Sequence, residues 1–404
     1  MTGQETLEGE ARALMAAQDW AAAAERWAQV RAQRPSHLQA HASGVEALIR
    51  SHRFSEAEAL AAELDARFRG RPRAELFLAE LTARHGRWAE AADRYDRVAA
   101  GSPDQAAHVM RNPVYRQAVL NAHGILEGSR RLDTVTHADI AGLAAPAPED
   151  RDAAAAPEDR DYVFVSGMPR AGTTALGHLL NSRPEIVLFT ELHNPYVAYA
   201  PQCFTPALVA ARKERQPSVA QGNALQALPN AAFVGDKRPL FHYGLPHTAQ
   251  AMAGRRMTVL HILRSPPHVA ASYDARARNP ADQWDPLRDL GNCIHELNVM
   301  HRFIADWHRA GAMPDGHRLV FVDYERVFRD LEYALGLFET IGVADPGSER
   351  LRGSVARFHE KSAAVLSRER PIDPRVRAAL EAGLDRDAAR DVTALTGIDV
   401  TGSS

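Results

Sequence analysis

The stretch YVFVSGMPRAGTTALGHLLNS, residues 162–182, decides the fold expected for this chain. Its first six residues have the pattern of a buried strand, and a glycine-containing turn then leads into the helical TTALGHLLNS. Further apolar runs at 186–190, 231–235, 257–263 and 319–324 alternate with helical stretches. This alternation predicts an α/β domain, a parallel β-sheet with helices on both faces. In such sheets ligands bind beyond the carboxyl ends of the strands.

The turn after the first strand, GMPRAGTT at residues 167–174, has the composition of a phosphate-binding loop. Glycines let the backbone turn tightly around an anion, and the free N–H groups of the next helix face the turn. Nucleotide triphosphatases carry a lysine where this chain has Thr173, which argues against an ATPase or kinase. The predicted anion ligands of this P-loop-type turn are Arg170, Ala171, Gly172, Thr173 and Thr174.

A second anion site is predicted at RSPPHVAAS, residues 264–272, where a strand ends and a helix begins. The guanidinium of Arg264 can make a forked, charge-assisted contact with a phosphate. Taken alone, an arginine at a strand end is as often a surface ion pair. The first loop, placed earlier in the same domain, makes the anion site the preferred interpretation.

Both stretches resemble the sulfotransferase family, whose loop reads PKSGTT or PRSGTT where this chain has PRAGTT. The family's Arg, its Pro two residues on and its Ser eight residues on correspond to Arg264, Pro266 and Ser272. The resemblance covers roughly residues 162–343 and implies the donor 3′-phosphoadenosine 5′-phosphosulfate (PAPS). It implies that the loop holds the 5′-phosphosulfate and that Arg264 and Ser272 hold the 3′-phosphate. No metal is expected, since no HxH, HExxH or Asp cluster lies near the loops.

The reacting groups follow from the resemblance to the tyrosylprotein and related bacterial branch of that family. Glu191, after the strand 186–190, corresponds to the general base, and His193 is the rival because other branches use histidine. Lys237, in VGDKRP, corresponds to a lysine that we expect to stabilise the bridging or equatorial oxygens together with Arg170. The expected reaction is in-line transfer of a sulfuryl group to an acceptor hydroxyl or amine.

The sequence leaves other parts of the donor site without assigned residues. Tyr324 and Glu325 match a strand-end YE of the family, with an expected structural role. The adenine ligands are unassigned, and Trp284 is as well explained by the core as by an acceptor wall. The candidates for a late basic segment that closes the donor site are Lys361, Arg368 and Arg370.

The first part of the chain repeats with a period of 34 residues. Trp20, Phe54 and Trp88 begin the similar phrases WAAAA, FSEAE and WAEAA. This period of paired helices resembles the tetratricopeptide repeat, an all-α domain that could bind the acceptor, a protein or a peptide. The expected organisation is a repeat domain at 1–143, a Pro- and charge-rich linker at 144–161 and the α/β domain at 162–404. A generic helical bundle is the alternative for the first region.

Composition limits the remaining choices. The 48 Lys and Arg nearly balance 51 Asp and Glu, so no whole-chain attraction to nucleic acid is indicated. Cys203 and Cys293 match no metal or redox spacing and are expected to be reduced thiols. No signal peptide or membrane span is recognised, which predicts a cytoplasmic protein. Two alternative functions are a P-loop kinase or nucleotide-binding protein, and a repeat scaffold with an inactive sulfotransferase domain.

Overall fold

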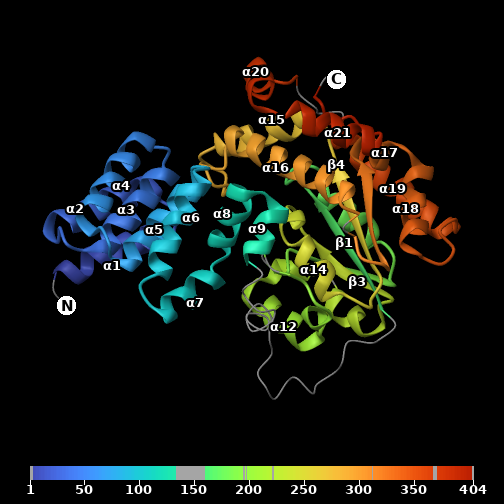
Figure 1. Cartoon of the computed structure of the whole chain (residues 1–404), viewed down its shortest axis with the longest axis horizontal. Coiled ribbons are helices and arrows are strands. Elements are labelled where there is room, and N and C mark those ends of the chain that lie inside the picture. The colour runs from blue at the N-terminus through green and yellow to red at the C-terminus, as the bar shows by residue number, and fades with distance from the viewer. Residues whose placement is uncertain are drawn as a thin grey trace. The chain divides into compact units, whose positions relative to one another are not determined.

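A computed structural model describes residues 3–132, 160–193, 196, 198–220, 223–311, 313–366 and 371–402. Its helices and strands are drawn in Figure 1. The chain forms two compact units, one of Met1–Ala122 with Ser272–Cys293 and the other of His123–Ala271 with Ile294–Ser404. The domain limits expected from the sequence stay a prediction. The linker expected at 144–161 lies, up to residue 159, outside the described residues, as do residues 133–143.

The first unit consists of helices that follow the 34-residue period. Trp20, Phe54 and Trp88 are each the first residue of a helix, at α2, α4 and α6. The helices of the repeats run as α1 Gly3–Ala16, α2 Trp20–Gln33, α3 Leu38–Arg50, α4 Phe54–Phe68, α5 Pro72–Arg84, α6 Trp88–Ala99, α7 Pro103–Arg111 and α8 Pro113–His123. Ala23 and Ala91 are fully buried, because only a small side chain fits where these helices approach closely. The helices agree with the predicted repeats, and the tetratricopeptide assignment itself stays a prediction.

A segment from late in the sequence completes this unit. Leu287 joins the hydrophobic core of the first repeats, together with Trp27 and Leu81. The Arg84 guanidinium makes two bonds to the Asp285 carboxylate, at 2.7 and 3.0 Å. The sequence pattern did not predict these contacts, because they join residues about two hundred positions apart.

The second unit is built on a five-stranded parallel sheet of strand order β2-β3-β1-β4-β5. Its strands are β1 Asp161–Gly167, β2 Ile186–Thr190, β3 Phe233–Lys237, β4 Met257–Leu263 and β5 His317–Asp323. The predicted α/β fold is therefore confirmed. β3 lies two residues later than expected, because Asp236 and Lys237 are buried members of the strand although charge usually ends an apolar run.

The remaining helices include those that flank this sheet (Figure 1). They are α9 Ile125–Leu132, α11 Thr173–Leu180, α12 Pro206–Arg215, α13 Ala224–Ala227, α14 Leu245–Ala251, α15 Pro266–Ala277, α16 Leu290–Arg309, α17 Tyr324–Arg329, α18 Leu331–Ile341, α19 Glu349–Leu366, α20 Pro374–Gly383 and α21 Arg386–Thr396, with short 3₁₀ turns η2 Pro201–Phe204, η3 Pro217–Val219, η4 Leu228–Asn230 and η5 Phe241–Tyr243. α15 and α16 each begin in one compact unit and end in the other. Among the described helices none has the length and apolarity needed to cross a membrane.

Candidate active site

The predicted phosphate loop connects β1 to α11 and has the backbone of an anion cradle. Gly172 has φ +95° and Arg170 has φ +71°, so the chain turns through the left-handed region twice. A Cβ on Gly172 would lie 2.7 Å from the ring of Tyr324, so the site needs glycine for space as well as for conformation. α11 begins at Thr173 without a side-chain cap, which leaves its first N–H groups directed toward the loop.

Arg264 lies directly after β4 and reaches this loop. Its Nη1 donates to the carbonyl oxygen of Arg170 at 3.0 Å. Its guanidinium also lies 4.2 Å from the centre of the Tyr324 ring, a cation–π contact. The structure thus brings Arg264, one residue of the predicted second anion site, to the phosphate loop. Arg264 and the loop both face one cavity of about 690 Å³.

The charged side chains that the structure describes around this cavity are all cationic. Its charged lining residues are Arg170, Arg264, Arg357 and Lys361, and none of the described lining residues is Asp or Glu. Thr173 and Thr174 line it as predicted, with Gly172 between them and Arg170. Ser272, in the second half of α15, is not among the lining residues. A cluster of four cations is suited to an anion that carries more than one negative charge.

An aromatic wall completes the cavity. Tyr324 and Phe328 belong to α17 with ring centres 4.6 Å apart, and Phe358 of α19 stacks on Phe328 at 5.3 Å. No sequence motif singles out Phe328 or Phe358, and Tyr324 was expected to have only a structural role. No motif singles out Arg357 either, although it precedes the candidate Lys361 by one helical turn. The other two candidates, Arg368 and Arg370, lie outside the described residues.

Glu191 and Lys237 form an ion pair at the carboxyl ends of β2 and β3. Lys237 Nζ lies 2.7 Å from Glu191 Oε1, and Arg238 Nη1 lies 3.7 Å from the other carboxylate oxygen. The Lys237 side chain is 4% exposed, whereas that of Glu191 is 43% exposed. Lys237 therefore holds the carboxylate from the protein side and leaves it open to an incoming group.

Lys237 also adjoins the phosphate loop through α11. A Cβ on Gly177 of that helix would lie 3.3 Å from the Cβ and Cγ of Lys237, so the lysine stem runs against the glycine. Neither Glu191 nor Lys237 lines the 690 Å³ cavity. They lie at the same sheet edge, since the carboxyl ends of parallel strands share one edge.

His193, the rival base, has a different environment. Its ring is buried and meets the Tyr199 ring edge-on at 5.4 Å. Burial lowers the pKa of His193 to about 4, and the nearby Arg212 and Arg238 add to the effect. Its imidazole is neutral at pH 7 and directed into protein.

Trp284 lies in the helical unit and packs against two arginines there. The guanidinium groups of Arg276 and Arg288 each lie 4.9 Å from the centre of its ring. Its indole Nε1 donates to the Arg288 carbonyl at 2.8 Å. These contacts favour the packing role for Trp284 over the acceptor wall.

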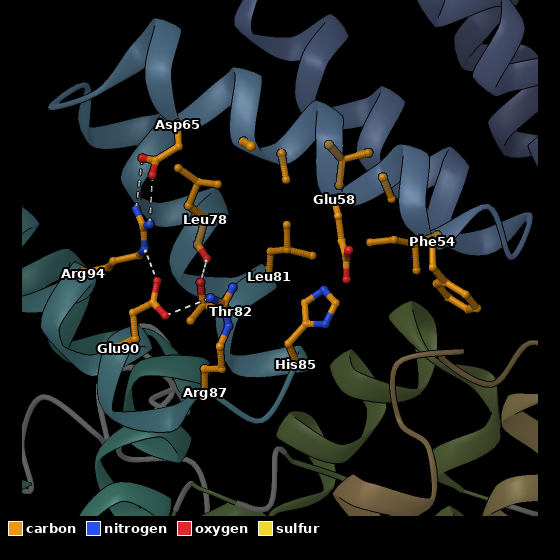
Figure 2. A pocket seen from close by; sticks show the side chains of 15 residues that line it. Phe54, Glu58, Asp65, Leu78, Leu81, Thr82, His85, Arg87, Glu90 and Arg94 are labelled. Carbon is orange, nitrogen blue, oxygen red and sulfur yellow. Dashed lines mark hydrogen bonds and ion pairs between the residues drawn. The ribbon is translucent and has the colours of Figure 1, made fainter.

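A second cavity, of about 620 Å³, lies among α3, α4, α5 and α6 of the repeats (Figure 2). Its floor is apolar, with Leu78 and Leu81 from α5. Arg94 pairs with Asp65 at 3.2 Å and with Glu90 at 3.4 Å, and Arg87 pairs with Glu90 at 3.0 Å, so these two cations offset the two carboxylates. This arrangement suits packing or docking. No described group of His, Cys, Asp and Glu side chains could hold a metal ion.

Comparison with known proteins supports the expected resemblance for one segment of the second unit. Residues 162–342 match the sulfotransferase family. The resemblance expected from the motifs is confirmed over this segment, which supports a sulfotransferase. Similar solved structures include the sulfotransferase domain of the Synechococcus PCC 7002 olefin synthase, with 16% identity, TM-score 0.34, and 60% of this chain and 96% of that chain covered. A Mycobacterium tuberculosis H37Rv sulfotransferase has 15% identity, TM-score 0.37, and 70% and 92% coverage. No curated protein sequence matches the chain.

Proposed function

We propose that this chain transfers the sulfuryl group of PAPS to an acceptor hydroxyl or amine. The observation that carries the proposal is the single cavity in which the phosphate loop and Arg264 meet, with four cations and no described carboxylate in its lining. PAPS carries anionic groups at both ends of its ribose, and a site for it needs two cradles. ATP lacks the 3′-phosphate that would use the second one.

The loop residues and the N-terminus of α11 would hold the 5′-phosphosulfate. Arg264 would hold the 3′-phosphate, and Ser272 remains its proposed second ligand. The purine would stack on the wall of Phe328 and Phe358, since every base offers a flat face to an aromatic ring. Arg357 and Lys361 on α19 would close the site, the role left open in the sequence.

In the proposed reaction the acceptor oxygen or nitrogen attacks the sulfur atom in line with the bond to the departing phosphate oxygen. The S–O bond to the nucleotide breaks, and adenosine 3′,5′-bisphosphate leaves with the bonding electron pair. The acceptor proton goes to the Glu191 carboxylate, which Lys237 holds at 2.7 Å. Lys237 and Arg170 neutralise the charge that develops on the bridging and equatorial oxygens.

Binding and turnover together test this proposal. Calorimetry should show tight binding of adenosine 3′,5′-bisphosphate, and labelled donor with a cell extract should yield a labelled acceptor. Glu191→Gln should lower turnover by about 10²- to 10⁴-fold, the usual worth of a general base, and leave bisphosphate binding intact. The control is Glu339→Gln, an exposed carboxylate on α18. Tight Mg-ATP binding without bisphosphate binding would favour the kinase alternative. Bisphosphate binding without turnover on any acceptor would favour the inactive scaffold.

We also propose that the repeat cavity of Figure 2 binds an apolar segment of another polypeptide that carries one basic residue. Phe54 is 38% exposed at its edge, and among the described residues Glu58 has no cation within ion-pair distance. On an array of peptides, the chain should select apolar sequences with Lys or Arg. Glu58→Lys should abolish that binding, and Glu80→Lys, exposed on α5, should not. Selection of acidic peptides, or binding that survives Glu58→Lys, would contradict the assignment.

The compartment proposed is the reducing cytoplasm. Cys203 and Cys293 are both buried and neither forms a disulfide, which is consistent with a reducing compartment.

A further inference from the structure

The turn that carries Glu191 is held by hydrogen bonds along its whole length. The Glu191 N–H donates to the Lys237 carbonyl at 3.0 Å, which extends the β2–β3 ladder by one residue. The next N–H, of Leu192, donates to Asp236 Oδ2 at 3.0 Å. The one after that, of His193, donates to the hydroxyl oxygen of Tyr199 at 3.3 Å. Three consecutive backbone donors therefore have assigned acceptors in a segment outside regular secondary structure.

Asp236 and Tyr199 form one connected unit beneath this turn. The Tyr199 hydroxyl donates to the same Asp236 oxygen that accepts from Leu192. Tyr199 is itself held in place, because its N–H donates to Thr248 Oγ1 at 3.0 Å and its ring packs on Phe164 at 5.2 Å. The pair is therefore a rigid platform, and it is connected to the Glu191 turn by two bonds.

The Asp236 carboxylate is buried although it is a polar group, and this burial needs a structural reason. Asp236 is fully buried in β3, on the face of the sheet opposite its neighbour Lys237. Burial raises the pKa of Asp236 to about 6, against the opposing effect of Arg238 and its hydrogen bonds. Its second oxygen, Oδ1, has no hydrogen-bond partner among the described residues. Buried carboxylates are costly and are retained where they hold a geometry that apolar residues cannot.

The geometry that Asp236 helps to hold is the backbone conformation of Glu191. Its φ of +57° lies in the left-handed region, which a residue with a Cβ adopts only when its surroundings impose it. This conformation directs the carboxylate toward Lys237 Nζ at 2.7 Å. The bonds to Leu192 and His193 act on the two residues that follow, so they determine the direction in which the chain leaves Glu191.

We propose that Asp236 and Tyr199 are positioning residues that hold Glu191 in this left-handed turn, with its carboxylate facing the acceptor. The inference rests on the proposed function, in which Glu191 takes the acceptor's proton. Neither residue touches the donor cavity. Their loss should therefore lower kcat and leave the KM for the donor and the affinity for adenosine 3′,5′-bisphosphate unchanged.

The test uses Tyr199→Phe and Asp236→Asn in the full chain. Tyr199→Phe keeps the ring and removes the hydroxyl, and a misdirected base should lower kcat by about 10- to 100-fold. Tyr162→Phe is the matched control, since the Tyr162 ring is equally buried while its hydroxyl has no hydrogen-bond partner in the described part of the chain. Urea unfolding of each variant shows whether it folds.

A double-mutant cycle separates positioning from general support of the fold. In a Glu191→Gln background, Tyr199→Phe should produce no further loss of kcat, because it acts through Glu191. Asp236→Asn gives a second, independent cycle if Tyr199→Phe is poorly folded. Equal and additive losses in both backgrounds, or wild-type kcat in the folded single variants, would overturn the inference. If the wild-type chain binds no bisphosphate, the proposed function fails instead, so the two failures are distinguishable.

Discussion

Replacement of Gly172 by alanine tests whether the phosphate loop and Arg264 form one site. Gly172 has φ +95°, and a Cβ there would lie 2.7 and 2.8 Å from two carbons of the Tyr324 ring. The left-handed backbone costs a non-glycine residue about 1–2 kcal/mol. The ring must also move, and it is the ring on which the Arg264 guanidinium lies at 4.2 Å. Loss of that cation–π contact costs about 0.5–2 kcal/mol.

Gly254→Ala is the matched control for the backbone cost. Gly254 precedes β4, has φ +78°, and has no atom within 4 Å of the position that a Cβ would take. Both variants should lose about 1–2 kcal/mol of unfolding free energy from φ alone. Gly172→Ala should lose about 0.5–2 kcal/mol more because of the displaced ring.

Calorimetry with adenosine 3′,5′-bisphosphate distinguishes the two. Gly172→Ala should weaken binding by about 2- to 30-fold if the lost contact of about 0.5–2 kcal/mol counts in full, since every 1.4 kcal/mol is a factor of ten. Gly254→Ala should bind like the wild type. Urea unfolding of each protein supplies the stability comparison. Wild-type affinity in a folded Gly172→Ala protein would refute the view that the loop, Tyr324 and Arg264 form one donor site.

Two further predictions concern stability. Asp285→Ala should lower the unfolding free energy of the helical unit by about 1–3 kcal/mol, because it leaves the half-buried Arg84 without its two-bond partner. Asp387→Ala removes one member of an exposed pair and should have no measurable effect on urea unfolding. Burial lowers the pKa of several histidines. The pKa falls to about 4 for His193 and His301 and to about 3 for His261, and it is also lowered for His242. The unfolded chain then binds more protons below the ordinary histidine pKa of about 6.5, so stability should fall by about 1 kcal/mol per histidine from pH 7.5 to 5.5. A urea midpoint that is unchanged or higher at pH 5.5 would contradict this.

Much of the site was predictable because its signals are local. A strand, two glycines and the start of a helix stand side by side in GMPRAGTT, and the structure has this order at β1 and α11. Arg264 was predictable for the same reason, from its place at a strand end. Glu191 and Lys237 required the family resemblance, since an isolated Glu or Lys after a strand has no distinguishing pattern. Their ion pair at 2.7 Å then appears only in the structure.

The remaining site residues could not be predicted because their neighbours are distant in sequence. Phe328 and Phe358 are ordinary core residues by helical spacing, and only the fold brings α17 and α19 to the phosphate loop. Asp236 looked like the end of a strand, and its contact with Tyr199 spans 37 residues. Leu287 enters the core of the repeats from a segment about two hundred residues later than Leu81.

The sequence by itself determined the secondary-structure order, the repeat period and the place of the anion cradle. Each of these depends on side-chain spacing or backbone freedom within a few residues. The tertiary structure decided which charges share a cavity, which carboxylate is buried and which one is open to a substrate. Those properties depend on distances through space and on exclusion of water, and neither is encoded in the spacing of residues along a chain.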